Sequence, residues 1–177
     1  MLSISTLIWL LLIVFACNDG EELLTAGAWV RQNQEKYTFA PKALRLDQNK
    51  PLTAQFAVAV AVVGSVLLTA TIVGAKTFAA TGQLHGLFVA AIVLIFLDGV
   101  KHILLSIGLR GYSSGVVSAA LVQVPYSVYA LHRFLAAGLV TWGEIIRDGA
   151  IGVVVIGPLL AAGFALGRLV VPARRTA

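Results

Sequence analysis

The sequence has little charge, little proline and a single cysteine. Of its 177 residues, only 12% are Asp, Glu, Lys or Arg, whereas 59% are hydrophobic, and the mean hydropathy is +0.91. This balance excludes an ordinary soluble domain, in which about a quarter of the residues are charged. The one cysteine, Cys17, excludes a disulfide within the chain. Because no histidine lies near it in the sequence, we expect neither a Cys–His nucleophile nor a zinc site there.

Basic residues are also missing ahead of the first apolar run. Residues 2–16 carry no charge, and the stretch 14–17 is loosely similar to a lipoprotein cleavage box. A secretory signal peptide needs a positive segment before its apolar core. The bulky Phe15 also stands where a small residue is usual. We therefore expect this run to remain in the protein as the first membrane-spanning helix.

Five long apolar segments follow one another along the chain. They cover residues 3–28, 52–74, 80–109, 116–137 and 150–171. Each is long enough to cross a hydrocarbon layer of roughly 30 Å as a helix. Pro125 is expected to kink the fourth segment near its middle. The sequence thus predicts an all-α polytopic transmembrane helical bundle of about five spans, with residues 1–177 forming a single integral membrane domain.

The basic residues are distributed unevenly between these spans. With the N-terminus outside, three of the 13 Lys and Arg residues, Lys76, Arg133 and Arg147, lie on the outer side, and the other ten lie in the cytoplasm. Basic residues collect on the cytoplasmic side of membrane proteins. We therefore expect an outside N-terminus and a cytoplasmic C-terminus. The net charge of +5 reflects this topology, so the expected partner is the lipid bilayer and no nucleic acid.

Polar side chains gather where the first and third spans end, at one predicted depth. Asn18, Glu21 and Glu22 are spaced to share one helix face, and Asp98 and His102 are spaced to share another. A charge inside a bilayer costs at least about 2.5 kcal/mol, so such residues usually face a partner or a water-filled cavity. The two faces are therefore predicted to meet in one site on the cytoplasmic side.

This set of side chains suits two kinds of chemistry. The candidate ligands for a divalent metal are Glu21, Glu22, Asp98 and His102. Without a metal, the same groups suit general acid and base catalysis, for which we select Glu21, Glu22 and His102. Asn18, Gln55 at the start of the second span and Tyr112 in the turn after the third are expected to bind the substrate.

A purely structural interpretation competes with both. If the first helix is short, Glu21 and Glu22 meet cytoplasmic water, and Asp98 pairs with Lys101 or His102 on its own helix. Under the catalytic interpretation, a Glu→Gln variant is expected to leave the fold intact, because removing a crowded carboxylate relieves its desolvation.

The chain resembles the HXXEE family of bacterial multi-pass membrane proteins, which is named for a histidine, two variable residues and a glutamate pair in the first helix. Here the motif reads Asn18-Asp19-Gly20-Glu21-Glu22, with Asn18 in place of the histidine. The later family features are matched by Asp98 and His102, by Tyr112-Ser113-Ser114-Gly115 where a Tyr-Pro-Gly-like turn is expected, and by Pro125. The resemblance covers about residues 5–135 and implies a protein of the bacterial inner (cytoplasmic) membrane, without a settled activity.

Three functions of different classes fit these observations. The first is an intramembrane enzyme, a metal-assisted hydrolase acting on a lipid-like substrate, with Glu21 or Glu22 as base and His102 as ligand or acid. The second is a small proton-coupled transporter or permease-like protein, in which the same carboxylates titrate. The third is a structural membrane protein without catalysis.

Overall fold

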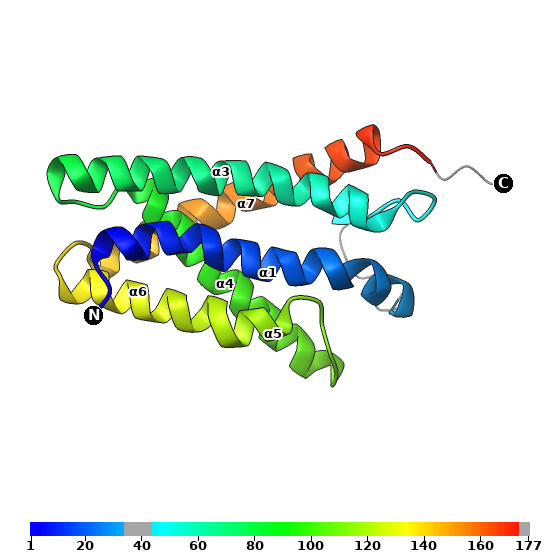
Figure 1. The fold of residues 1–177 in the computed structure, drawn as a ribbon, viewed down its shortest axis with the longest axis horizontal. Coiled ribbons are helices and arrows are strands. Elements are labelled where there is room, and N and C mark those ends of the chain that lie inside the picture. The colour runs from blue at the N-terminus through cyan, green and yellow to red at the C-terminus, as the bar shows by residue number, and fades with distance from the viewer. Residues whose placement is uncertain (34–43, 174–177) are drawn as a thin grey trace.

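The computed structural model describes residues 1–33 and 44–173. Within these two segments every regular element is helical, so the predicted all-α bundle is confirmed (Figure 1). The elements are α1 (Ile4–Gln32), α3 (Leu52–Thr81), α4 (Gly86–Leu109), α5 (Val116–Ser118), the π-helical turn η2 (Ala119–Gln123), α6 (Val124–Ala136) and α7 (Trp142–Val170). The elements α5, η2 and α6 follow one another without a break.

Three of the described helices, α3, α4 and α7, are long and apolar enough to cross a membrane. They contain most of the predicted spans 52–74, 80–109 and 150–171. The length and composition of these helices indicate a membrane protein. The two remaining predicted spans correspond to α1 and to the run from α5 to α6, and the count of five spans stays a prediction.

The connection between α3 and α4 lies later in the chain than predicted. Lys76 and Thr77, which fall between the predicted spans 52–74 and 80–109, are inside α3, which continues to Thr81. It ends there because Gly82 takes the left-handed conformation (φ 70°) and donates its backbone N–H to the Phe78 carbonyl. The third predicted span, placed at 80–109, therefore begins six residues too early, since α4 starts at Gly86.

Helix α7 starts well before the predicted position 150. Thr141 precedes the helix, and its side chain accepts a hydrogen bond from the backbone N–H of Glu144. In return, the backbone N–H of Thr141 donates a hydrogen bond to the Glu144 carboxylate. This reciprocal capping box satisfies two N–H groups that a helix start leaves free. Both residues precede the predicted span 150–171, whereas in the structure they form the start of the helix.

A π-helical turn stands directly before Pro125. In η2 the helix widens, and the backbone N–H of Val124 donates to the carbonyl of Ala119, five residues back. Proline has no N–H for the regular helical ladder and disturbs the turn that precedes it. The predicted distortion at Pro125 thus takes the form of a wide turn, which carries Gln123 to the face of α4.

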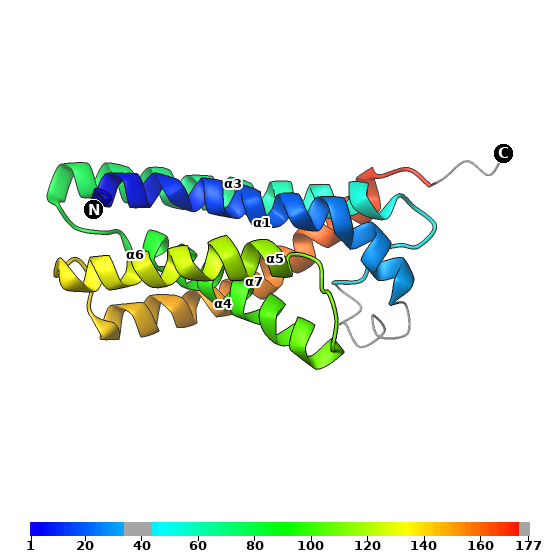
Figure 2. The same ribbon diagram turned by 60° about the horizontal axis from the view of Figure 1, so that its bottom comes forward.

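The helices lie roughly along one long axis, with α1 beside α3 and the α5–α6 run on the opposite side of α1 (Figures 1 and 2). Helix α4 crosses the bundle obliquely and ends near the turn that leads to α5. The apolar core joins α1, α4 and α6 through fully buried side chains such as Leu11, Phe88 and Phe134. The second half of α1 and the last turns of α4 therefore lie at the same end of the molecule.

Candidate functional site

Glu21 attaches α1 to the start of the α5–α6 run. Its Oε1 accepts hydrogen bonds from the Tyr112 hydroxyl at 2.7 Å and the Val117 N–H at 3.3 Å. Its Oε2 accepts from the Ser118 N–H at 2.7 Å and the Ser118 hydroxyl at 2.5 Å. A carboxylate thus caps the first N–H groups of a helix, where it is favoured. Burial and the hydrogen bond to Glu21 raise the pKa of the Tyr112 phenol, so Tyr112 keeps the proton that it donates.

Asn18 makes a second attachment to the same segment. Its side-chain amide, only 1% exposed, donates to the Gly115 carbonyl at 3.0 Å and to the Ser118 hydroxyl at 3.2 Å. Together with Glu21, one turn further along α1, it holds the beginning of the α5–α6 run against α1. The predicted substrate-binding residue Asn18 is therefore engaged inside the protein.

The centre of the site is an imidazole between two carboxylates, and we name Glu22, Asp98 and His102 the acid–base cluster. His102 Nε2 lies 3.1 Å from Glu22 Oε1 of α1 and 3.3 Å from Asp98 Oδ2 of its own helix. These are ion-pair distances, but neither contact has the angles of a hydrogen bond, and both ring nitrogens are buried without a hydrogen-bond partner among the residues that the structure describes. The His102 side chain is 3% exposed, compared with 16% for Glu22 and 38% for Asp98.

Further polar groups surround Asp98. Lys101 Nζ lies 2.5 Å from its Oδ1, which is the pair expected under the structural interpretation. Gln123, 1% exposed, donates from its amide to the Ile95 carbonyl at 2.9 Å and to Asp98 Oδ2 at 3.2 Å. The Gln123 Oε1 atom is buried and has no hydrogen-bond partner within the described part of the chain. Asp98 thus belongs to the cluster and also balances a lysine at the surface.

Gly115 closes the cluster on the side of the turn. Its φ of +84° is one that other residues rarely adopt. A Cβ placed on it would lie 3.0 Å from both the Glu22 Cγ and the His102 Cε1. Two residues earlier, the buried Ser113 hydroxyl donates to the His102 carbonyl at 3.0 Å. The turn therefore needs glycine at 115 for its backbone and for the approach of the two acid–base side chains.

Gln55 is the one predicted site residue that the structure places elsewhere. Its side chain, on α3, is fully buried, and both ends of its amide bind the backbone of Asp47: the Asp47 N–H donates to Oε1 at 2.9 Å, and Nε2 donates to the Asp47 carbonyl at 2.8 Å. It holds the segment before α3 in place. The other predicted site residues, Asn18, Glu21, Glu22, Asp98, His102 and Tyr112, do lie at one end of the bundle.

Three residues that contribute to the site were not predicted from the sequence. Asp19 lies close enough to Glu22, Asp98 and Lys101 to interact electrostatically with all three. Asp19 is inside the motif but does not lie on the helix face shared by Asn18, Glu21 and Glu22, from which the site was predicted. Gln123 stood out only as a polar residue in an apolar span. Ser118 carried no signal, because a serine near a turn is common.

The predicted metal ligands do not form a metal site. Among residues 1–33 and 44–173, no three His, Cys, Asp or Glu side chains are arranged to hold a metal ion. Both Glu21 oxygens already accept hydrogen bonds from protein donors, and Asp98 Oδ1 faces the Lys101 ammonium. The donor set therefore does not support a divalent metal. What it offers is a buried imidazole beside two carboxylates, an arrangement that can hold and move a proton.

A family model described as a protein of unknown function with an HXXEE motif matches residues 9–130. The match covers more than half of the chain and includes every residue of the acid–base cluster. No curated protein and no solved structure matches the chain.

Proposed function

The chain belongs to the family of proteins of unknown function with an HXXEE motif, and from its buried side chains we propose that it is a membrane enzyme whose acid–base cluster transfers protons without a metal. The substrate class that we propose is lipid-like. Within the motif, we assign Asn18 to the position of the histidine. The proposal replaces the metal-assisted hydrolase expected from the sequence with metal-free acid–base catalysis.

The burial of His102 between Glu22 and Asp98 carries the proposal. Imidazole is the side chain whose protonation ordinarily changes between pH 5 and 8, which suits it to general acid–base catalysis. A charge buried without a partner is costly, so each carboxylate gains from an imidazolium beside it. Two carboxylate oxygens, one from α1 and one from α4, lie within 3.3 Å of His102 Nε2.

The roles follow from exposure and from existing contacts. The Glu21 carboxylate accepts four hydrogen bonds from protein donors, whereas Glu22 accepts none of these and is the proposed base. His102 is the proposed acid. Asp98 orients the imidazole from one turn earlier on α4. Glu21 and Asn18 position the turn, so we assign them no chemical step. Tyr112 is 46% exposed beside Glu21 and is the proposed contact for the substrate.

An assay of lipid turnover tests this function. The purified protein is incubated in detergent with defined phospholipids, their lyso forms and glycerol esters, and mass spectrometry follows the products. We expect turnover that survives EDTA and is abolished by Glu22→Gln and by His102→Asn. Glu144→Gln is the matched control, because this carboxylate caps the start of α7. Turnover that both cluster variants retain would exclude the proposed roles, and loss of turnover in EDTA would exclude the metal-free mechanism.

One observation favours proton-coupled transport as a second candidate. From Asp98, buried polar groups continue into the bundle: Gln123 has an oxygen without a partner, and Ser127, fully buried one turn later, donates to the Gln123 carbonyl at 2.8 Å. Asp, Glu and His side chains inside membrane proteins often belong to proton relays, and this series begins at one such residue, Asp98. Proteoliposomes with an internal pH dye distinguish the two functions, because a transporter moves protons with its solute and an enzyme does not.

The membrane placement is also part of the proposal. We propose five spans in the bacterial inner membrane, with the N-terminus outside and the C-terminus in the cytoplasm. The supporting observations are the ten-to-three distribution of basic residues and the three long apolar helices. In this orientation the acid–base cluster lies toward the cytoplasmic side.

A further inference from the structure

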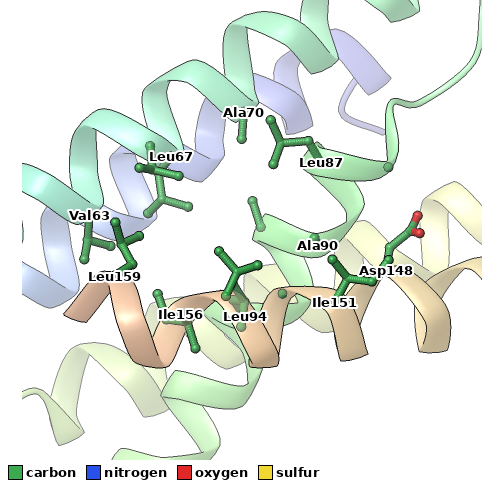
Figure 3. Close-up of a pocket in the computed structure, with 15 residues that line it drawn as sticks. Val63, Leu67, Ala70, Leu87, Ala90, Leu94, Asp148, Ile151, Ile156 and Leu159 are labelled. Atoms are coloured by element: carbon green, nitrogen blue, oxygen red, sulfur yellow. The ribbon is translucent and has the colours of Figure 1, made fainter. Parts of the chain in front are cut away.

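Helices α3, α4 and α7 enclose an apolar cavity of about 360 Å³ (Figure 3). Its walls include Leu67 and Ala70 of α3, Leu87 and Ala90 of α4, and Ile151 and Leu159 of α7. Among its lining residues, Asp148 is the one with a charged side chain, and it stands at one end. Small-molecule sites are typically concave and apolar, with a few polar groups that orient the ligand. The cavity has this composition.

Close backbone contacts on several sides keep the cavity from collapsing. Helix α7 approaches α4 at Gly149, where a Cβ would lie 2.7 Å from a Val93 methyl group. Further along, it approaches α3 at Gly167, where a Cβ would lie 2.5 Å from the Gln55 carbonyl oxygen. Helices α3 and α4 meet at Gly74, where a Cβ would lie 2.7 Å from the Phe88 Cβ. Because the helices already touch there, they cannot close the space between these points.

The cavity opens to the outer surface of the bundle. Four of its lining side chains are substantially exposed: Val66 by 38%, Leu87 by 41%, Val155 by 54% and Ile151 by 56%. All three walls come from helices that are long and apolar enough to cross a membrane. In the membrane placement proposed above, on which this inference rests, the opening faces hydrocarbon, and a lipid chain can enter sideways from the bilayer.

Two opposite charges stand together at the Asp148 end. The Asp148 carboxylate is buried, and its Oδ1 accepts a 2.7 Å hydrogen bond from Arg147 Nε. The Arg147 side chain is 62% exposed. The other oxygen, Oδ2, faces Gly86, where an added Cβ would come within 3.0 Å of it. Glycine at 86 thus lets the carboxylate pack directly against the start of α4 at the end of the cavity.

We propose that the cavity binds one acyl chain of a zwitterionic phospholipid of the ethanolamine type, with the lipid ammonium at Asp148 and the lipid phosphate at Arg147. Asp148 lies six residues, or about 9 Å, inside the start of α7, where the exposed Trp142 marks an interfacial position. The cavity extends along α7 from Asp148 to Leu159, a distance of about 16 Å. This is the depth to which the acyl chain can enter. This site lies at the other end of α4 from the acid–base cluster and is independent of its function.

Native mass spectrometry of the full chain in detergent tests the site, with added phosphatidylethanolamine and phosphatidylglycerol of identical acyl chains. We expect one bound phosphatidylethanolamine per protein, held at least about tenfold more tightly than phosphatidylglycerol, which lacks the ammonium. Asp148→Asn should remove this preference for phosphatidylethanolamine, while the acyl chains of both lipids should still bind in the cavity. Ala90→Leu, which fills the cavity, should weaken both lipids by about tenfold or more. Ala150→Leu adds the same atoms on the exposed face of α7 and should change neither.

Equal affinity of the wild type for the two lipids would overturn the assignment of the headgroup. If a folded cavity-filling variant still binds phosphatidylethanolamine as tightly as the wild type, the cavity is not the binding site of the acyl chain. If Ala90→Leu does not fold, Ala70→Leu fills the same space from α3 and gives the same decision.

Discussion

At the scale of single residues, a side chain at Gly115 would both strain the backbone of the turn and crowd the acid–base cluster. We expect Gly115→Ala to lower the free energy of unfolding by about 2 kcal/mol or more, because a left-handed alanine costs about 1–2 kcal/mol and its Cβ also crowds Glu22 and His102. Thermal unfolding in detergent measures the effect.

Two glycines serve as controls for Gly115. Gly82 also has a positive φ (+70°), but a Cβ there meets nothing within 4 Å, so Gly82→Ala isolates the backbone strain. Gly108 lies within α4 with open space around it, so Gly108→Ala should be neutral or stabilise by up to about 1 kcal/mol. Equal losses for Gly115→Ala and Gly82→Ala would show that the cluster does not crowd the turn.

The two glutamates of the motif should respond differently to the same substitution. Glu21→Gln replaces an acceptor of four hydrogen bonds by an amide with one oxygen, so we expect it to lower the free energy of unfolding by about 1–3 kcal/mol. Glu22→Gln leaves those bonds intact and should change the melting temperature little while abolishing activity. Equal thermal effects of the two variants, measured side by side, would contradict this division.

The sequence located most of the site, because polar residues are few and helical spacing decides which of them share a face. It assigned equal roles to Glu21 and Glu22, since spacing does not say which carboxylate meets the donors of a turn some 95 residues later. That information resides in the packing of α1 against Val117 and Ser118. Our expectation that any Glu→Gln variant keeps its fold is therefore replaced, for Glu21, by the loss predicted above.

At the scale of helices, α7 packs against α3 through glycine. A Cβ on Gly167 would come 2.5 Å from the Gln55 carbonyl oxygen, so Gly167→Ala has to separate the two helices. We expect a loss of about 1–3 kcal/mol in the free energy of unfolding. Gly157→Ala, on the same helix but with nothing within 4 Å, is the matched control and should cost little. Similar melting temperatures for the two variants would argue against a close α3–α7 contact.

The helices themselves were predictable, and their ends were not. Long apolar runs identify helices in a chain with so little charge, whereas an end depends on one residue. Gly82 ends α3, and Thr141 with Glu144 begins α7, each through hydrogen bonds made within one turn. Hydropathy does not register these capping residues, so both predicted boundaries differ from the helix ends in the structure.

At the scale of the whole molecule, the testable property is orientation. We expect a reporter fused after Ala177 to be active only in the cytoplasm, and one placed before Ile4 to be active only outside. The reason is the excess of basic residues predicted on the cytoplasmic side. The excess of basic residues on the cytoplasmic side can be reduced by replacing Lys50 and Arg31 with glutamine and adding two lysines beside Lys76. We expect this variant to insert in both orientations. A wild-type C-terminal fusion active outside would refute the proposed topology.

The hydrogen bond between Asn18 and Gly115 has a consequence for biosynthesis, because it joins residues 97 positions apart. A ribosome that adds about 5–20 residues per second takes about 5–20 s to make that length. During this interval α1 is complete, but the partners of Asn18 and Glu21 do not yet exist. The nascent helix must keep these polar groups at a wet interface or beside an insertion factor. The polar end of α1 is thus a site where chaperone contact during translation is to be sought.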